Sequence, residues 1–201
     1  SHAASLGYRI KLLAIIKRGK EGIELSVEPA LVPISHMIGS VNDSFNAIFV
    51  KGDIVDETMY YGRGAGRAPT GSAVIGDILE AARDVLNDAG SPVGITMLLQ
   101  HHELTYVPAE QVQKRAYVRI SLADEPGAMG EVMKALGAHH INVASVIQPE
   151  QHPSGSVPVI ILTEKAREVD FVKAMQEIEQ LDCCVDTPVR MRLEDFEDES
   201  S

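Results

Sequence analysis

Hydrophobic and polar residues alternate along the first sixty positions in the way expected of half-buried β-strands. The predicted strands cover residues 8–16, 23–32, 45–50 and 55–61. The last two flank Lys51-Gly52-Asp53, which is a hairpin signal. Four strands joined by short turns predict an antiparallel sheet. Pro29 and Pro33 predict that the second strand ends early or lies at an edge.

A helical pattern follows a glycine-rich loop at residues 62–71. Over residues 72–87 the apolar residues recur every three or four positions, and Thr70 or Ser72 is the predicted N-cap. The segment 87–92 stops this helix with Asn, Gly and Pro. Residues 89–115 show no clean period, so we expect a connector with one short strand near 94–99.

The remaining pattern predicts the order β-α-β-β-α-β over residues 116–193. The predicted elements are a strand at 117–122, a helix at 127–138, strands at 141–147 and 157–163, a helix at 167–181 and a strand at 183–192. The apolar spacing predicts a buried stripe on the second helix, made of Val169, Val172, Met175 and Ile178. The acidic residues 194–199 are expected to form a solvated end.

The expected fold class is therefore α+β, with a mainly antiparallel first region and a ferredoxin-like βαββαβ domain. We expect the first region to span residues 1–105, a linker 106–115, the second domain 116–193 and an acidic tail 194–201.

Composition narrows the function classes. The 201 residues are 45% hydrophobic, and 18 basic against 29 acidic side chains give a net charge of −11, which argues against nucleic-acid and anionic-membrane partners. Aromatic residues are only 4% and Trp is absent, so base stacking is disfavoured. No apolar run has the length of a membrane span. Cys183 and Cys184 are adjacent and cannot form an ordinary disulfide, which favours a reducing cytoplasm.

The glycine-rich loop does not match a dinucleotide fingerprint, because Arg67 and Pro69 stand where the two possible registers need a third glycine. A strand, a bare loop and a helix start can still present backbone N–H groups to an anion, with Arg63 and Arg67 adding charge. The alternative is a tight strand-to-helix turn without a ligand.

A second loop, residues 124–131 (DEPGAMGE), lies between a predicted strand and a predicted helix. Gly127 lets a ligand approach the backbone, and the free N–H groups of the first helical turn suit a carboxylate. Asp124 could cap the helix or accept an α-ammonium group. Asn142 starts the next strand, where its amide can donate and accept. The alternative is that Asp124 is only a cap and Asn142 only a turn residue.

Metal and nucleophile sites are not predicted. His101 and His102 would point to opposite faces of a strand, and His139-His140 sits at a helix end where a cation suits the dipole. The cysteines are predicted to be one buried and one exposed thiol. We therefore assign no metal and no catalytic residue.

Five segments of the first region together resemble the homoserine dehydrogenase catalytic domain. They are residues 6–13 (LGYRIKLL), 28–33 (EPALVP), 45–53 (FNAIFVKGD), 59–66 (MYYGRGAG) and 69–77 (PTGSAVIGD). The resemblance implies that Gly64, Ala65 and Gly66 face an NAD(P) cofactor. It also implies that the Rossmann domain, the acidic substrate ligands and the catalytic lysine precede this region, so the chain alone should be inactive.

The second region resembles the ACT domain through the loop 124–131 and the strand at 141–146 (INVASV). The resemblance implies an amino-acid effector, with L-threonine expected, held by Asp124, Gly127, Ala128, Met129 and Asn142. It also implies pairing into a homodimer. Two alternatives remain open, a stand-alone amino-acid-binding regulator and a dimerisation module.

Overall fold

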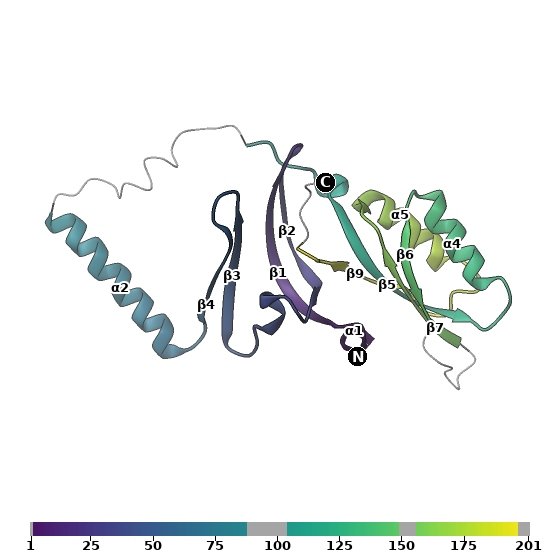
Figure 1. Cartoon of the computed structure of the whole chain (residues 1–201), viewed down its shortest axis with the longest axis horizontal. Coiled ribbons are helices and arrows are strands. Elements are labelled where there is room, and N and C mark those ends of the chain that lie inside the picture. The colour runs from purple at the N-terminus through teal and green to yellow at the C-terminus, as the bar shows by residue number, and fades with distance from the viewer. Residues whose placement is uncertain (1, 88–103, 149–155, 197–201) are drawn as a thin grey trace. The chain divides into compact units, whose positions relative to one another are not determined.

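The computed structural model describes residues 2–87, 104–148 and 156–196 (Figure 1). By contacts the chain divides into two compact units. One unit combines Ser1–Ile34 with Leu104–Ser201, and the other is Ser35–Glu103. No helix within the described residues is long and apolar enough to cross a membrane.

The first unit is built on a seven-stranded mixed sheet with the order β1-β2-β9-β5-β7-β6, and β8 pairs with β5. Its strands are β1 (Tyr8–Gly19), β2 (Gly22–Pro33), β5 (Gln113–Ala123), β6 (Val143–Ile147), β7 (Ser156–Thr163), β8 (Ala166–Arg167) and β9 (Val189–Leu193). Its helices are α1 (His2–Ser5), η2 (Ala109–Gln111), α4 (Ala128–Ala138) and α5 (Glu168–Glu179).

The part of this sheet ordered β9-β5-β7-β6 confirms the predicted βαββαβ arrangement. Figure 1 shows α4 and α5 on the same side of these strands. Alternate residues of β5 point into the core beneath them, as a period of two requires. The core under the helices includes Val118, Ile120, Val132, Leu136, Ile161, Phe171 and Ile178. The opposite face packs Tyr117 and Ile160 against Leu31 and Ala3.

The predicted buried stripe of α5 is confirmed at Ile178 and in part at Met175, which packs against the core, but it is wrong at Val172. The helix buries Phe171, Ala174 and Ile178, whereas Val172 is 42% exposed. Both sets of residues have helical spacing, so the pattern could not choose between them. Packing of the helix against the sheet makes the choice, and it brings the largest side chain, Phe171, to the centre of the core.

The last strand also begins later than predicted, at Val189. Cys183 and Cys184 precede it in a turn, and Cys184 forms only an isolated bridge with Leu122. Cys183 is buried as expected, but Cys184 is half-buried rather than exposed.

The β1–β2 hairpin does not end at its prolines. β2 runs through Pro29 to Pro33 and is bordered by β9 on its other side, so the predicted early end or edge position is wrong. Pro29 has the same parity as Ile23 and Leu31, whose backbone groups bond to Thr105, Val107 and Glu194. Backbone groups of that parity point away from β1, and a proline there removes no hydrogen bond of the hairpin.

The second unit contains η1 (Met37–Ser40), the antiparallel hairpin of β3 (Phe45–Gly52) and β4 (Asp56–Arg63), and α2 (Arg67–Leu86). The predicted hairpin is confirmed, but it forms its own two-stranded sheet, so the four strands do not make one antiparallel sheet. Helix α2 begins at Arg67, and its N-cap is Gly66 rather than Thr70 or Ser72. Pro69 is tolerated there because the first turn needs no N–H donor.

The acidic end is not wholly solvated. Glu194 is only 4% exposed and is paired with Lys17 and Arg192, and Asp195 is paired with Arg115. Burial with cationic partners explains this, since a carboxylate leaves water only when it is compensated. The division of the chain at residues 105 and 115 stays a prediction, as does the expected strand near 94–99, which lies outside the described residues.

Candidate functional site

The loop at the start of α4 is an open turn. Gly127 is the N-cap residue with φ 100°, a conformation that favours glycine, and it carries no side chain to cap the helix. A Cβ at Gly127 or Gly130 would meet no atom within 4 Å. Asp124 and Gly127 are exposed, Met129 is half-buried and Ala128 is buried. The turn therefore presents uncovered backbone at Gly127 and Gly130, next to the exposed Asp124.

The amides of this turn are only partly used. The N–H of Ala128 reaches the carbonyl of Glu125 at 3.4 Å, and the N–H of Glu131 donates to Gly127 at 3.2 Å. Among the hydrogen bonds of the described residues, none uses the amides of Met129 or Gly130. Donors of this kind at a helix start suit a carboxylate.

Beneath the turn lies Cys183, which sequence reasoning did not connect with it. Its thiol lies 3.8 Å from the carbonyl of Ala128 and 3.6 Å from a carboxylate oxygen of Glu131. Burial raises the pKa of this thiol, and the nearby Glu131 carboxylate raises it further. Cys183 is therefore a neutral packing group supporting the turn, not a nucleophile.

Asn142 does not lie beside this turn in the same chain. It precedes β6, and its carbonyl accepts from the amide of Glu164 at 2.8 Å, next to Thr163. Thr163 bonds to Ala116, near the start of β5, whereas Asp124 follows the end of β5. Eight residues of strand separate the two ends, or about 26 Å. A small ligand cannot contact both Asp124 and Asn142 of one chain.

The glycine turn before α2 is also exposed at Gly64, Ala65 and Gly66. Gly66 has φ 119° and caps α2 without a side-chain hydrogen bond, and its carbonyl accepts from Thr70 at 3.1 Å. A Cβ at Gly64 would overlap the side-chain amide of Asn46, so a larger residue there would have to displace that exposed side chain.

Arg63, one of the two arginines expected to add charge to that turn, contacts the β3–β4 hairpin instead. The guanidinium of Arg63 lies over the Phe45 ring at 4.8 Å, and Phe45 stacks on Tyr61 at 4.7 Å between centroids. These contacts fix the end of the β3–β4 hairpin directly before the turn. They were not predicted, because the three residues are brought together by hairpin register.

Neither turn lines the groove beside the tip of the β1–β2 hairpin. This groove has a volume of about 960 Å³, and its lining includes Lys17, Lys20, Gln111 and Lys165. Within residues 2–87, 104–148 and 156–196, no group of three His, Cys, Asp or Glu residues could hold a metal ion. His139 caps the end of α4 and contacts Glu177 at 2.7 Å, whereas His101 and His102 lie outside the described residues.

A βαββαβ sheet with an open glycine turn at its first helix defines an ACT-type domain, and the ACT domain family matches residues 116–183. The homoserine dehydrogenase family matches residues 1–79. Over nearly its whole length the chain is similar to homoserine dehydrogenases, matching the C-terminal part of their catalytic domain followed by an ACT domain.

Several homoserine dehydrogenases are similar in sequence to nearly the whole of this chain. Homoserine dehydrogenase of Neisseria gonorrhoeae is 36% identical over 200 residues, covering 98% of this chain and 46% of the relative. That of Helicobacter pylori is 36% identical over 192 residues, covering 96% and 44%. The crystal structure of a homoserine dehydrogenase from Thiobacillus denitrificans superposes with a TM-score of 0.86 at 35% identity, covering 98% of this chain and 44% of that one. The chain thus spans less than half the length of these relatives.

Proposed function

We propose that the chain is the C-terminal part of an NAD(P)-dependent homoserine dehydrogenase, which interconverts L-aspartate 4-semialdehyde and L-homoserine in the cytoplasm. Its ACT half binds an amino acid, and L-threonine is the proposed effector. The observation that carries the sensing function is the open start of α4, where Gly127 and Gly130 leave the backbone uncovered. Such a start binds the carboxylate of an amino acid, and Asp124 accepts its ammonium group.

The glycine turn before α2 is the proposed cofactor-facing element. Gly66 has a positive φ, which favours glycine, and Gly64, Ala65 and Gly66 are exposed, so the backbone of the turn is accessible to a cofactor. No catalytic residue is assigned in this chain. The rest of the relatives' length is proposed to hold the Rossmann domain and catalytic groups, so the chain alone should show no dehydrogenase activity.

The effector site is proposed to form in a homodimer. Because Asp124 and Asn142 lie at opposite ends of the sheet, a site that uses both needs the loop of one copy and the Asn142 strand of another. Sedimentation should show a dimer at tens of micromolar. If the chain is a monomer at that concentration in the presence of threonine, the proposal of a site shared between two copies is wrong.

Calorimetry tests the effector proposal. Threonine, isoleucine, serine and methionine are titrated into the chain and into Gly130→Val, which places a side chain beside the proposed site at a position where an added Cβ meets no atom within 4 Å. Gly137→Val is the matched control, because it lies in the same helix and also projects into open space. We expect threonine to bind the chain and the control, and at least about tenfold more weakly to Gly130→Val. Equal binding by both variants, or silence from all four amino acids, would reject the site.

The alternative is a stand-alone amino-acid-binding regulator, which the ACT fold alone would also permit. The two proposals differ in what precedes the chain. A dehydrogenase needs an upstream strand and helix with a G-x-G-x-x-G turn in the same reading frame. Sequencing upstream of the codon for Ser1 decides between them.

A further inference from the structure

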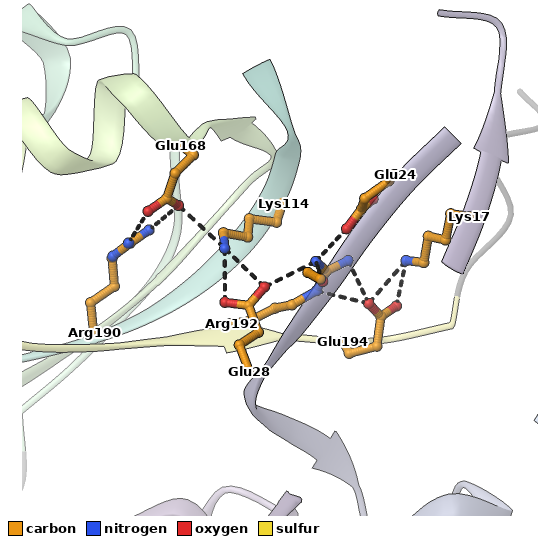
Figure 2. A network of polar contacts seen from close by, with 9 residues as sticks. Lys17, Glu24, Glu28, Lys114, Glu168, Arg190, Arg192 and Glu194 are labelled. Carbon is orange, nitrogen blue, oxygen red and sulfur yellow. Dashed lines mark hydrogen bonds and ion pairs between the residues drawn. The ribbon is translucent and has the colours of Figure 1, made fainter. Parts of the chain in front are cut away.

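A buried guanidinium connects the ACT sheet with the β1–β2 hairpin. Arg192 lies on β9, and its side chain is only 2% exposed. It contacts Glu194 at 2.8 and 3.0 Å, Glu24 at 2.5 Å and Glu28 at 3.3 Å (Figure 2). Two of these three carboxylates come from β2, within the region that matches the homoserine dehydrogenase family, whereas Arg192 follows the region that matches the ACT family.

Further charges on both sides complete the network. Lys17 of β1 binds Glu194 at 2.8 Å, and Lys114 of β5 binds Glu28 at 2.8 Å. Lys114 also contacts Glu168 of α5 at 3.3 Å, and Arg190 pairs with Glu168 at 2.5 Å. The interface thus holds four cations and four carboxylates, namely Lys17, Lys114, Arg190, Arg192, Glu24, Glu28, Glu168 and Glu194 (Figure 2). Their charges balance, and removal of Arg192 would take away the cation that contacts Glu24, whereas Glu28 would keep Lys114 and Glu194 would keep Lys17.

Other attachments of β2 lie on either side of this cluster. The parallel pairing with β9 involves only Ala30 and Leu31, next to the apolar packing of Leu31. At the other end, Ile23 exchanges backbone hydrogen bonds with Thr105 and Val107. Between them, residues 24–29 reach β9 and β5 through the side chains of Glu24, Ser26 and Glu28.

We propose that Arg192 is the positioning residue by which the ACT sheet holds the middle of β2, and that it couples the ACT half to the hairpin. Arginine suits this task because its planar fork donates to several carboxylates at once and stays charged when buried. A displacement of β5 or β9 would be transmitted to Glu24 and Glu28 through these side-chain contacts. The regulatory consequence rests on the proposed effector function, but the positioning role does not.

Hydrogen exchange on the 201-residue chain tests this role. Arg192→Met keeps an unbranched side chain and removes the guanidinium with its charge. We expect the amides of Glu24, Ser26 and Glu28 to exchange at least about tenfold faster, because three carboxylates lose their shared partner. The amides of β5 and β7, which lie over the apolar core, should keep their protection.

Arg190→Met is the matched control, since it changes the same residue type two positions away on β9 and removes contacts to Glu168 and to the Phe171 ring, neither of which belongs to β2. It should leave the exchange of β2 within about twofold of the unchanged chain. Unchanged exchange of β2 in Arg192→Met, or equal acceleration by both variants, would overturn the proposal.

If Arg192→Met does not fold, the test is made from the hairpin side. The double change Glu24→Gln with Glu28→Gln keeps the shapes and should accelerate the same amides; unchanged protection overturns the proposal. Experiments with added threonine distinguish the positioning role of Arg192 from the proposed effector function. If calorimetry finds no binding, the effector function fails, while the ligand-free comparison still decides the role of Arg192. If threonine binds, its effect on β2 exchange should vanish in Arg192→Met.

Discussion

A single hydroxyl at the end of β7 offers a sharp test of how the ACT sheet is held together. Thr163 is fully buried, and its Oγ1 accepts from the backbone N–H of Ala116 at 3.0 Å and lies 3.4 Å from the carbonyl of the same residue. Ala116 is itself 1% exposed. The side chain thus continues the β5–β7 pairing one residue beyond its last backbone pair, Tyr117 with Leu162.

Thr163→Val replaces this hydroxyl with a methyl group of similar size and leaves the N–H of Ala116 without its acceptor. An unsatisfied buried donor costs about 1–3 kcal/mol, which should lower Tm by about 2–4 °C for each kcal/mol in a chain of this size. Thr163→Ser is the control, because it keeps the hydroxyl and loses only a methyl group, for about 0.8 kcal/mol.

Urea unfolding followed by circular dichroism measures both variants against the unchanged chain. The valine variant should be the less stable of the two. If Thr163→Val is as stable as the unchanged chain, or the serine variant loses as much, the hydroxyl does not contribute as the geometry indicates.

Three further predictions concern charge, packing and backbone conformation. Burial works to raise the pKa of Glu194, but the charges and hydrogen bonds of its cationic partners outweigh burial and hold the pKa below its usual range. Its contribution to stability is therefore complete above the unfolded pKa, about 4.3, and is lost as pH falls through the lower folded pKa. As the pH is lowered, the free energy of unfolding should thus fall less steeply for Glu194→Gln than for the unchanged chain. Parallel curves of unfolding free energy against pH would contradict this. Phe171→Ala should cost about 3–5 kcal/mol, whereas Val172→Ala should cost about 0.5 kcal/mol, by the same urea assay, and equal losses would contradict the observed face of α5. Gly22→Ala should destabilise by more than about 1 kcal/mol, because Gly22 has φ 136° and its Cβ would lie 2.5 Å from the carbonyl oxygen of Thr105, and a neutral effect in thermal unfolding would contradict that strain.

Patterns near in sequence anticipated much of the fold. The alternation around residues 23–27 and the apolar spacing on either side of the turn at Gly127 predicted the hairpin strands and the βαββαβ order, both of which the structure contains. Such signals are local, because strand and helix periods are read within ten or so residues. The same locality explains the errors, since the helix pattern of α5 fitted two faces, one with Val172 and one with Phe171.

The ion pairs around Arg192 could not be predicted from short-range sequence patterns. Glu24 and Arg192 are 168 positions apart, and nothing near either residue indicates that they pair. Glu194 looked like the start of a solvated acidic run, because a run of carboxylates is usually hydrated. Only the parallel pairing of β2 with β9 brings it between Lys17 and Arg192.

The sequence by itself determined the two glycine turns, the order of strands and helices, and the family resemblance, since these depend on residues that are neighbours along the chain. Only the tertiary structure decided that the first hairpin extends the ACT sheet, and that Asp124 and Asn142 lie at opposite ends of it. The physical reason is that strand order and direction are set by which surfaces can be buried together, and that choice is made by the whole chain.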